Sequence, residues 1–319
     1  MLNYAARRVM LLIPVIIGVS FIIFSIMNLT PGDPAMLILG EGAPPEALEA
    51  KREELGLNAP FIRRYVEYIS GAVQGDFGKS YRTGIPVFNE IMTRLPYTVM
   101  LATISIIVAI VIGIPAGVLS AVKQYSIMDV SALAVTLLIT SMPGFFLSMC
   151  LIIVFSLKLN WLPSLGIESW KSYILPGIAA ASSTTASLMR MTRSTMLEVI
   201  RQDYIRTARA KGAPERSVIF GHALRNSLLP VVTVIGVNFG VALGGSIVIE
   251  QVFAMPGLGQ LMVNSIRTKD TPMVLASVLF AAIIASLVNL LVDIWYCFID
   301  PRLASQYSSA RNAGKKAGV

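Results

Sequence analysis

Six stretches of the chain contain no Asp, Glu, Lys or Arg and are long enough to cross a bilayer as helices. They cover residues 9–29, 95–122, 130–157, 172–189, 226–249 and 271–292. A helix spans the hydrocarbon core with about 20 apolar residues, and lipid offers no water to backbone groups left unpaired. The chain is therefore predicted to be an all-α polytopic membrane protein with six transmembrane helices, the third of them bent at Pro143.

The composition is typical of a membrane protein. Hydrophobic residues make up 55% of the 319 residues and charged residues only 14%, whereas a soluble domain carries roughly 25% charged residues. The net charge of +8 is assigned to flanks that face membrane lipid, and no nucleic-acid partner is expected. Cys150 and Cys297 lie in apolar runs and are interpreted as small hydrophobic side chains. A single histidine, His222, excludes a multi-histidine metal site.

The beginning of the chain is similar to a secretory signal peptide, because Arg7 and Arg8 precede an apolar run. The run is too long for the apolar part of a signal peptide, and no small-residue cleavage pattern follows it. A turn is predicted instead at residues 30–34. We therefore expect an uncleaved first helix.

The distribution of Lys and Arg predicts that both termini are cytoplasmic. With the N-terminus inside, the inner segments hold 15 basic residues and the outer segments 11. Seven of those 11 lie in the long outer loop 30–94, where charge has less influence on orientation. Without that loop the count is 15 against 4.

The chain is expected to divide into three parts. Residues 1–94 hold the first transmembrane helix and an extracytoplasmic loop with short helices. Residues 95–302 hold five further transmembrane helices with a cytoplasmic loop at 190–225, and residues 303–319 are predicted to be a disordered cytoplasmic tail. Short helices of the outer loop are predicted over residues 44–55, 61–69 and 87–94.

Small and polar residues within the apolar runs mark candidate pore or gating positions. Gly236, Gly240 and Gly244 share one helix face, where small residues allow a close approach of two helices. This face is either internal packing or a seam that opens during transport. Asp293 is the one ionisable residue expected at membrane depth, with Asn289 one turn earlier, and it is interpreted either as structural or as part of a substrate path.

The most basic segment is the loop 190–225, which holds eight of the 26 basic residues. A capping box is predicted at residues 195–198. Asp203 is expected to cap a short helix over residues 204–211, and Gly212 is expected to end it. Such a helix between two turns offers a rigid docking surface to a partner, although its charge also suits ordinary attraction to anionic lipid.

At this loop the sequence resembles the cytoplasmic signature of ABC-importer permeases. The resemblance rests on Arg206-Thr207-Ala208-Arg209-Ala210-Lys211-Gly212 and, ten residues later, His222-Ala223-Leu224-Arg225-Asn226. The general signature begins Glu-Ala-Ala, and the different residues at 206–208 are typical of the branch that carries dipeptides, oligopeptides and nickel. Further motifs extend the resemblance over nearly the whole chain: Pro31-Gly32-Asp33-Pro34, Gly75-Asp76-Phe77-Gly78, Arg94-Leu95-Pro96, Ser141-Met142-Pro143, Glu250, Val252-Phe253, Pro256-Gly257-Leu258-Gly259 and Asp300-Pro301-Arg302.

The resemblance implies a type I ABC importer permease fold in a bacterial-type cytoplasmic (inner) membrane. It implies a second homologous permease subunit, two cytoplasmic ABC ATPase subunits and an extracytoplasmic substrate-binding protein as partners. The short basic helix would be the coupling helix that lies in a cleft of one ATPase subunit. The ATPase-coupling residues it implies are Asp203, Tyr204, Ile205, Arg206, Thr207, Ala208, Arg209, Ala210, Lys211 and Gly212.

Roles within this loop and at the outer mouth follow from the resemblance. Tyr204 and Ile205 are expected to contact the ATPase through apolar surface, and the basic side chains are expected to supply charge complementarity. On the outer side, Glu250, Pro256 and Gly257 are expected to contact the binding protein.

The sequence thus predicts the permease subunit of an ATP-driven importer for di- or oligopeptides, which forms half of the translocation pore. A permease for nickel or a metal chelate is the alternative within the family, and a stand-alone secondary carrier is the alternative from another class. No catalytic, cofactor-binding or metal-ligating residue is expected in this chain, because ATP and Mg bind the partner ATPases. The substrate, and whether the two permeases are identical, stay open.

Overall fold

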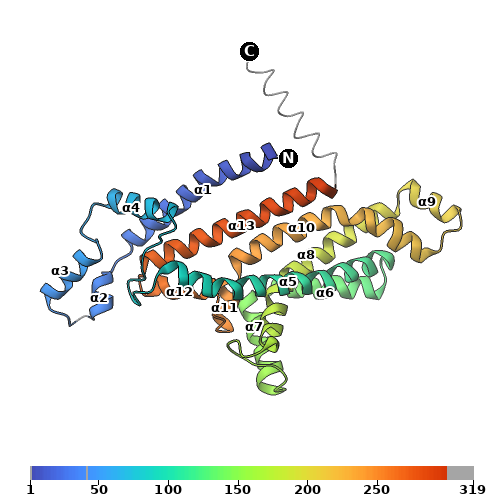
Figure 1. Ribbon diagram of the computed structural model, residues 1–319. Helices are drawn as coiled ribbons and strands as arrows, with labels where there is room; N and C mark the ends of the chain where they lie inside the picture. Colours follow the sequence, from blue (N-terminus) through green and yellow to red (C-terminus); the bar gives the residue numbers. More distant parts are fainter. Residues whose placement is uncertain (1, 41, 300–319) are drawn as a thin grey trace, which may run out of the picture.

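The computed structural model describes residues 2–40 and 42–299. These residues form helices joined by turns and loops, and the only strand-like pairing among them is one isolated bridge between Lys79 and Pro86. This confirms the prediction of an all-α chain for the described part. Long helices form a bundle (Figure 1). They are α1 (Leu2–Leu29), α5 (Val87–Val122), α8 (Ile174–Ile200), α10 (Leu224–Gly245) and α13 (Thr271–Ile299).

The two predicted loops lie at opposite ends of this bundle (Figure 1). One end carries the short helices of the first loop, which are α2 (Pro34–Leu39), α3 (Pro45–Glu54) and α4 (Phe61–Val73). The other end carries α9 (Asp203–Ala210), and the beginning of α1 and the end of α13 point toward that same end. The predicted tail, residues 303–319, lies outside the described residues.

Three helical stretches are long and apolar enough by themselves to cross a membrane, namely Val87–Val122, Ser217–Gly244 and Thr271–Val292. A fourth is formed if the bent pair Ile127–Ser141 and Gly144–Lys158 counts as one span. The apolar part of α1, Ile13–Leu29, is shorter. Of the six predicted spans, length and composition therefore support up to four among the described residues.

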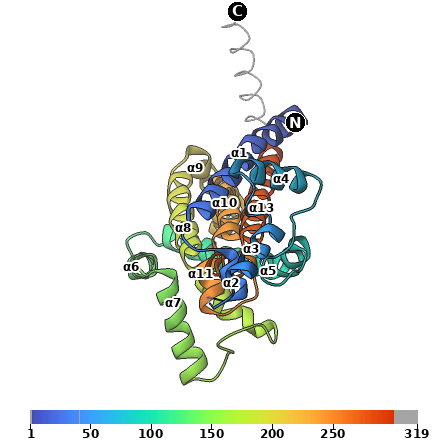
Figure 2. The same ribbon diagram turned by 90° about the vertical axis from the view of Figure 1, so that its left-hand side faces the viewer.

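The third predicted span is broken and not merely bent. It consists of α6 (Ile127–Ser141) and α7 (Gly144–Leu151), with the π-helical segment Ile152–Lys158 continuing α7. The two arms meet at 105°, and α7 points away from the bundle (Figure 2). Pro143 lacks a backbone N–H and disfavours helical geometry at Met142, which takes an extended conformation, so the helix ends there.

The outer loop follows the predicted helices with two differences. The predicted helix 87–94 is not separate, because it is the first part of α5. An unpredicted helix, α2, begins at Pro34, and the Asp33 carboxylate caps it by accepting a bond from the Ala35 N–H at 2.9 Å.

The closest helix packing joins α5 to α8 through glycines. A methyl group at Gly113 or Gly117 would approach the backbone of α8 to 2.8 or 2.7 Å, which is too close. On α10, Gly236 and Gly240 lie against side chains of α13, whereas Gly244 faces open space. Two of the three α10 glycines therefore serve internal packing.

The remaining helices complete the end of the bundle that carries the first loop. They are a short 3-10 helix (Trp170–Tyr173), α11 (Ile247–Val252) and α12 (Leu258–Arg267). The chain reverses between α11 and α12 at residues 253–257, and α12 then leads to the beginning of α13.

Candidate coupling surface and translocation cavity

The predicted coupling helix exists, with bounds one residue from those expected. It is α9, and it ends before Gly212, whose φ of 79° is the left-handed geometry that glycine tolerates. The capping details are corrected. Gln202 occupies the N-cap position and Asp203 is the first helical residue, while Thr195 lies inside α8 and not in a capping box.

Ile205 fastens α9 to the rest of the chain. Its side chain is fully buried in a cluster with Met196 of α8, Val118 of α5 and Val218 of the π-helical segment Ser217–Ala223. The expectation that Ile205 contacts a partner is therefore wrong, because it has no exposed surface. The apolar residue that was assigned to the interface is instead the anchor of the helix.

The other residues of α9 present a polar, basic surface. The exposed residues are Asp203, Tyr204, Arg206, Thr207, Arg209, Ala210, Lys211 and Gly212. Ala208 packs partly against the anchoring cluster. Tyr204 is 45% exposed, and its hydroxyl accepts a bond from Asn226 Nδ2 at 3.0 Å, which holds the ring in place on this surface.

Arg209 is engaged within its own loop. Its Nη2 and Nε donate to the two Glu215 carboxylate oxygens at 2.7 and 3.1 Å. These bonds lower the pKa of Glu215 and raise the pKa of Arg209. Both side chains are exposed, so the pair ties the end of α9 to the following turn without removing charge from the surface.

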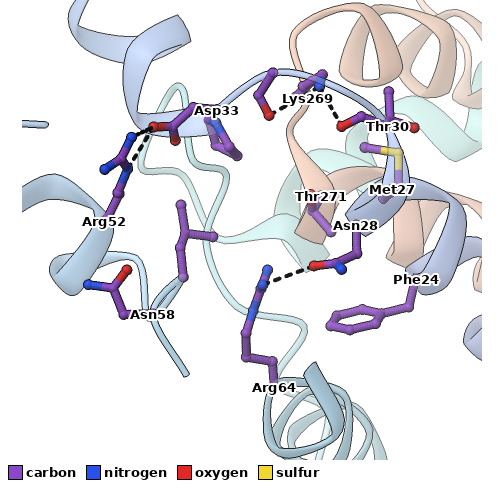
Figure 3. Close-up of a pocket in the computed structure, with 13 residues that line it drawn as sticks. Phe24, Met27, Asn28, Thr30, Asp33, Arg52, Asn58, Arg64, Lys269 and Thr271 are labelled. Carbon is purple, nitrogen blue, oxygen red and sulfur yellow. Dashed lines mark hydrogen bonds and ion pairs between the residues drawn. The ribbon is translucent and has the colours of Figure 1, made fainter. Parts of the chain in front are cut away.

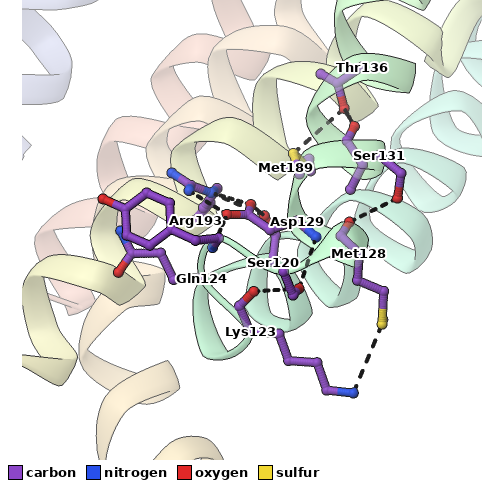
Figure 4. A network of polar contacts seen from close by, with 12 residues as sticks. Ser120, Lys123, Gln124, Met128, Asp129, Ser131, Thr136, Met189 and Arg193 are labelled. Atoms are coloured by element: carbon purple, nitrogen blue, oxygen red, sulfur yellow. Dashed lines mark hydrogen bonds and ion pairs between the residues drawn. The ribbon is translucent and has the colours of Figure 1, made fainter.

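A second ion pair, which the sequence analysis missed, joins α6 to α8 (Figure 4). Arg193 donates from Nε and Nη2 to the two Asp129 carboxylate oxygens, each at 2.8 Å. The Asp129 carboxylate also accepts from the Tyr125 N–H at 2.9 Å and from the Ser120 hydroxyl of α5. Asp129 is buried, and its carboxylate accepts all four of these hydrogen bonds.

This pair and the α9 anchor share one end of α5. Ser120 lies between Val118 and Ala121, both members of the cluster that buries Ile205. α9 therefore contacts the same end of α5 to which α6 and α8 are hydrogen-bonded. A movement of α9 would reach both helices through this end. The only signal in the sequence was an acidic residue, Asp129, one position before an apolar run.

A cavity lies farther along the bundle, between α5, the break of α6 and α7, α8 and α10. Its volume is about 460 Å³. Most of its lining is apolar, and polar side chains reach it from α5, α6, α8, α10 and the junction of α10 and α11: Ser105, Thr140, Ser182, Ser183, Thr184, Asn238 and Ser246. Among the described residues that line it, none is Asp, Glu, Lys, Arg or His. This cavity could not be predicted from the sequence, because its polar residues are hydroxyl and amide groups spread over several apolar runs.

Of the two predicted pore residues of α13, Asn289 lies outside the cavity. The Asn289 side chain contacts Gly240 of α10 and does not line the cavity. Asp293 lies in α13, but its side chain is outside the described part of the chain. The described residues therefore do not bring these two candidates into the cavity with Asn238.

Glu250 is buried, 1% exposed, at the end of the bundle that carries α2, α3 and α4. Its carboxylate accepts bonds from Thr98 Oγ1 at 2.8 Å, Ser246 Oγ at 2.9 Å and the Gln260 N–H at 3.0 Å. Burial raises its pKa, although these donors act in the opposite direction. Glu250 thus holds the start of α12 against α5.

The expected contact of this region with a binding protein is corrected in part. Glu250 and Gly257 are both buried, so neither has exposed surface with which to contact a binding protein directly. Gly257 is required there because a methyl group would overlap the Glu250 carboxylate. Pro256 is half-buried and Ala254 is exposed, so the reverse turn itself keeps an accessible edge.

A second pocket, of about 400 Å³, opens among α1, the outer loop and the turn before α13 (Figure 3). Lys269 crosses one side and donates to the carbonyls of Thr30 at 2.9 Å, Gly32 at 3.2 Å and Pro31. On the other side Arg52 bonds Asp33 at 2.7 Å. These contacts fasten the outer loop to the end of the bundle.

The described residues contain no group of three or more His, Cys, Asp or Glu side chains that could hold a metal ion. Cys150 is a free cysteine. The described part of the chain therefore offers hydrogen-bonding groups along its cavity and charged groups at its two ends.

Two family descriptions match this chain. Residues 113–305 match the binding-protein-dependent transport system inner membrane component. Residues 1–102 match the N-terminal part of a binding-protein-dependent transport system membrane component. Together the matches cover both the outer loop and the region with the cavity and α9.

Curated relatives and solved structures agree with these matches. The glutathione transport system permease protein GsiC of Escherichia coli (strain K12) is 42% identical over 303 residues, which is 95% of this chain and 99% of the relative. The protein of the same name from Shigella dysenteriae serotype 1 has the same identity and coverage. An inward-facing crystal form of the MetNI methionine ABC transporter aligns with a TM-score of 0.57 at 19% identity, over 66% of this chain and 96% of that chain.

Proposed function

Because the chain belongs to the family of binding-protein-dependent transport system inner membrane components, and is an ABC importer permease subunit, we propose that it imports di- or oligopeptides. The relatives are transport components, so the chain is not itself an ATPase. The relative named for glutathione supports the peptide class, since glutathione is a tripeptide. In this proposal ATP and Mg bind two partner ATPase subunits.

The proposed topology has six membrane crossings with both termini in the cytoplasm. The count of basic residues supports it, and so does the location of the outer loop and α9 at opposite ends of the bundle. Residues 1–94, 95–302 and 303–319 remain the proposed parts of the chain. A second permease would complete the pore, and a substrate-binding protein would dock on the outer loop and the exposed edge near Pro256.

The observation that carries the proposed coupling is the contrast within α9 itself. Ile205 is fully buried and attaches the helix to α5 and α8, while the residues around it are exposed, basic and polar. A helix that is packed on the bundle through one face and exposed on the other can pass the displacement caused by a partner on to the bundle. Closure of the ATPase pair on ATP would move α9, and the end of α5 would carry the movement toward the cavity.

The cavity favours peptide over free metal as the cargo. A bare nickel ion is best held by imidazole, thiolate or carboxylate ligands, and none of these groups is among the described residues that line the cavity. Hydroxyl and amide groups instead match the amide groups of a peptide.

The Gly212→Val substitution tests the coupling. Valine at a φ of 79° is strained by about 1–2 kcal/mol or more, so the end of α9 should reshape while the bundle stays intact. We expect the reconstituted complex to hydrolyse ATP without importing substrate. ATP hydrolysis and import are measured in the same proteoliposomes.

Gly221→Val is the matched control for this test. Gly221 is exposed in the same loop but does not have a positive φ, so its variant should import normally. Import by the G212V variant at the wild-type rate per ATP would remove the coupling role from α9.

A further inference from the structure

The cavity between α5, α6, α7, α8 and α10 has hydroxyl and amide groups set among apolar side chains. Its described lining holds no ionisable residue. A fixed charge in these low-dielectric surroundings would attract or repel a charged cargo strongly. Hydroxyl and amide groups interact with any cargo that carries donors and acceptors, whatever its net charge.

Asn238 and Thr184 supply a donor and an acceptor side by side. The Asn238 Nδ2 donates to the Val234 carbonyl at 2.7 Å, which orients the amide. Its Oδ1 is then left 3.5 Å from the Thr184 hydroxyl, at the long limit of a hydrogen bond. Both groups are therefore able to exchange this weak contact for bonds to a ligand.

This arrangement matches a peptide unit. An amide oxygen accepts from a peptide N–H, and a hydroxyl donates to a peptide carbonyl. Ser183 is exposed on the same helix as Thr184 and adds a third group to the lining. All three side chains can bond the main chain, which every peptide shares, and none distinguishes acidic from basic side chains.

We infer that this cavity binds the main chain of the peptide during its passage, with Asn238 and Thr184 as contact residues, and that its uncharged lining makes passage indifferent to side-chain charge. The inference rests on the proposed function and extends it to a site and a recognition rule. Transport also requires that cargo leave, and weak neutral contacts allow release.

A carboxylate placed in the cavity tests the inference. The complete complex with its partner subunits and binding protein is reconstituted, and ATP-dependent import of labelled Ala-Ala, Ala-Lys, Ala-Asp and glutathione is measured. In the Asn238→Asp variant we expect the import of Ala-Asp relative to Ala-Lys to fall about fivefold or more compared with wild type, because a like charge now faces the acidic peptide.

Two further variants keep the result interpretable. Ser183→Asp introduces the same charge from α8 and should shift the ratio in the same direction, even if the N238D variant fails to assemble. Asn289→Asp is the matched control, because Asn289 is an amide of the neighbouring helix α13 that contacts Gly240 outside the cavity. Its import ratio should change less than that of N238D, since residue 289 lies outside the lining and its charge is farther from the cargo.

The outcomes separate the inference about the cavity from the proposed function of peptide import. If the complex imports peptides and neither cavity variant changes the ratio, the cavity does not contact the cargo and the proposed function stands. A shift in the N289D variant as large as in N238D also overturns the inference. A wild-type complex that imports none of the probes with ATP contradicts the proposed function, and the inference fails with it.

Discussion

Two ion pairs of the same geometry lie near the end of the bundle that carries α9, and they differ in their surroundings. Arg193 and Asp129 form one bidentate pair, and Arg209 and Glu215 form the other. The Asp129 side chain is 2% exposed, whereas the Glu215 side chain is 57% exposed. The first pair joins α6 to α8, and the second closes a turn within one loop.

The difference teaches that geometry alone does not set the contribution of an ion pair. In water, an exposed pair loses much of its attraction to solvent screening and side-chain entropy. A buried carboxylate has no water to return to, so the loss of its partner leaves an uncompensated charge. The buried pair therefore holds α6 against α8. The exposed pair only links the end of α9 to the turn that follows it.

The largest expected effect comes from breaking the buried pair. Arg193→Met leaves the Asp129 carboxylate without its cation, and we expect a loss of about 3 kcal/mol in stability. This is the lower end of such costs, because the Arg193 side chain is 20% exposed and water reaches part of the pair. The apparent melting temperature of the purified protein in detergent measures it.

The double variant D129N/R193M is the control for this prediction. It removes both charges together, so it should melt above the R193M single variant. A melting temperature of R193M equal to wild type would show that the pair does not hold α6 against α8.

An intermediate effect is expected at the anchor between the two pairs. Ile205→Ala removes a fully buried side chain and should cost about 2 kcal/mol, at the low end for such truncations because α9 is able to settle into the space. Faster amide hydrogen exchange in α9 than in α8 would confirm that the loss is local. Arg206→Ala, at the exposed position next to Ile205, should leave the exchange rates unchanged. Equal acceleration in both variants would contradict the anchoring role.

The smallest effect is expected for the exposed pair. Glu215→Ala should change the melting temperature little, since exposed pairs contribute little. The lowered pKa of Glu215 means that any stabilisation is present above its unfolded-state pKa and is lost as pH falls through the lowered value. Melting curves across that pH range, for wild type and variant, should converge at low pH. A drop as large as that of R193M would break the distinction between the two pairs.

Much of the candidate site was accessible from local sequence. The bounds of α9 follow from a basic segment stopped by Gly212, and the break between α6 and α7 follows from Pro143. The roles of individual residues were less accessible. Ile205 was assigned to the partner surface and proved to be buried, because a helix of eight residues does not reveal from its sequence which face the bundle covers.

The sequence by itself determined the helical class, the apolar runs, the breaks at Pro143 and Gly212, and the resemblance that the family matches confirm. These features are set by neighbours along the chain, since helix length, proline and glycine act within one or two turns. Only the tertiary structure decided the 105° angle between α6 and α7, the burial of Glu250, the cavity and the Asp129–Arg193 pair. The two residues of that pair are 64 positions apart. Gly113 and Gly117 let α8 pack directly on α5, which places Arg193 beside Ser120 of α5. No local pattern specifies which distant helices come into contact.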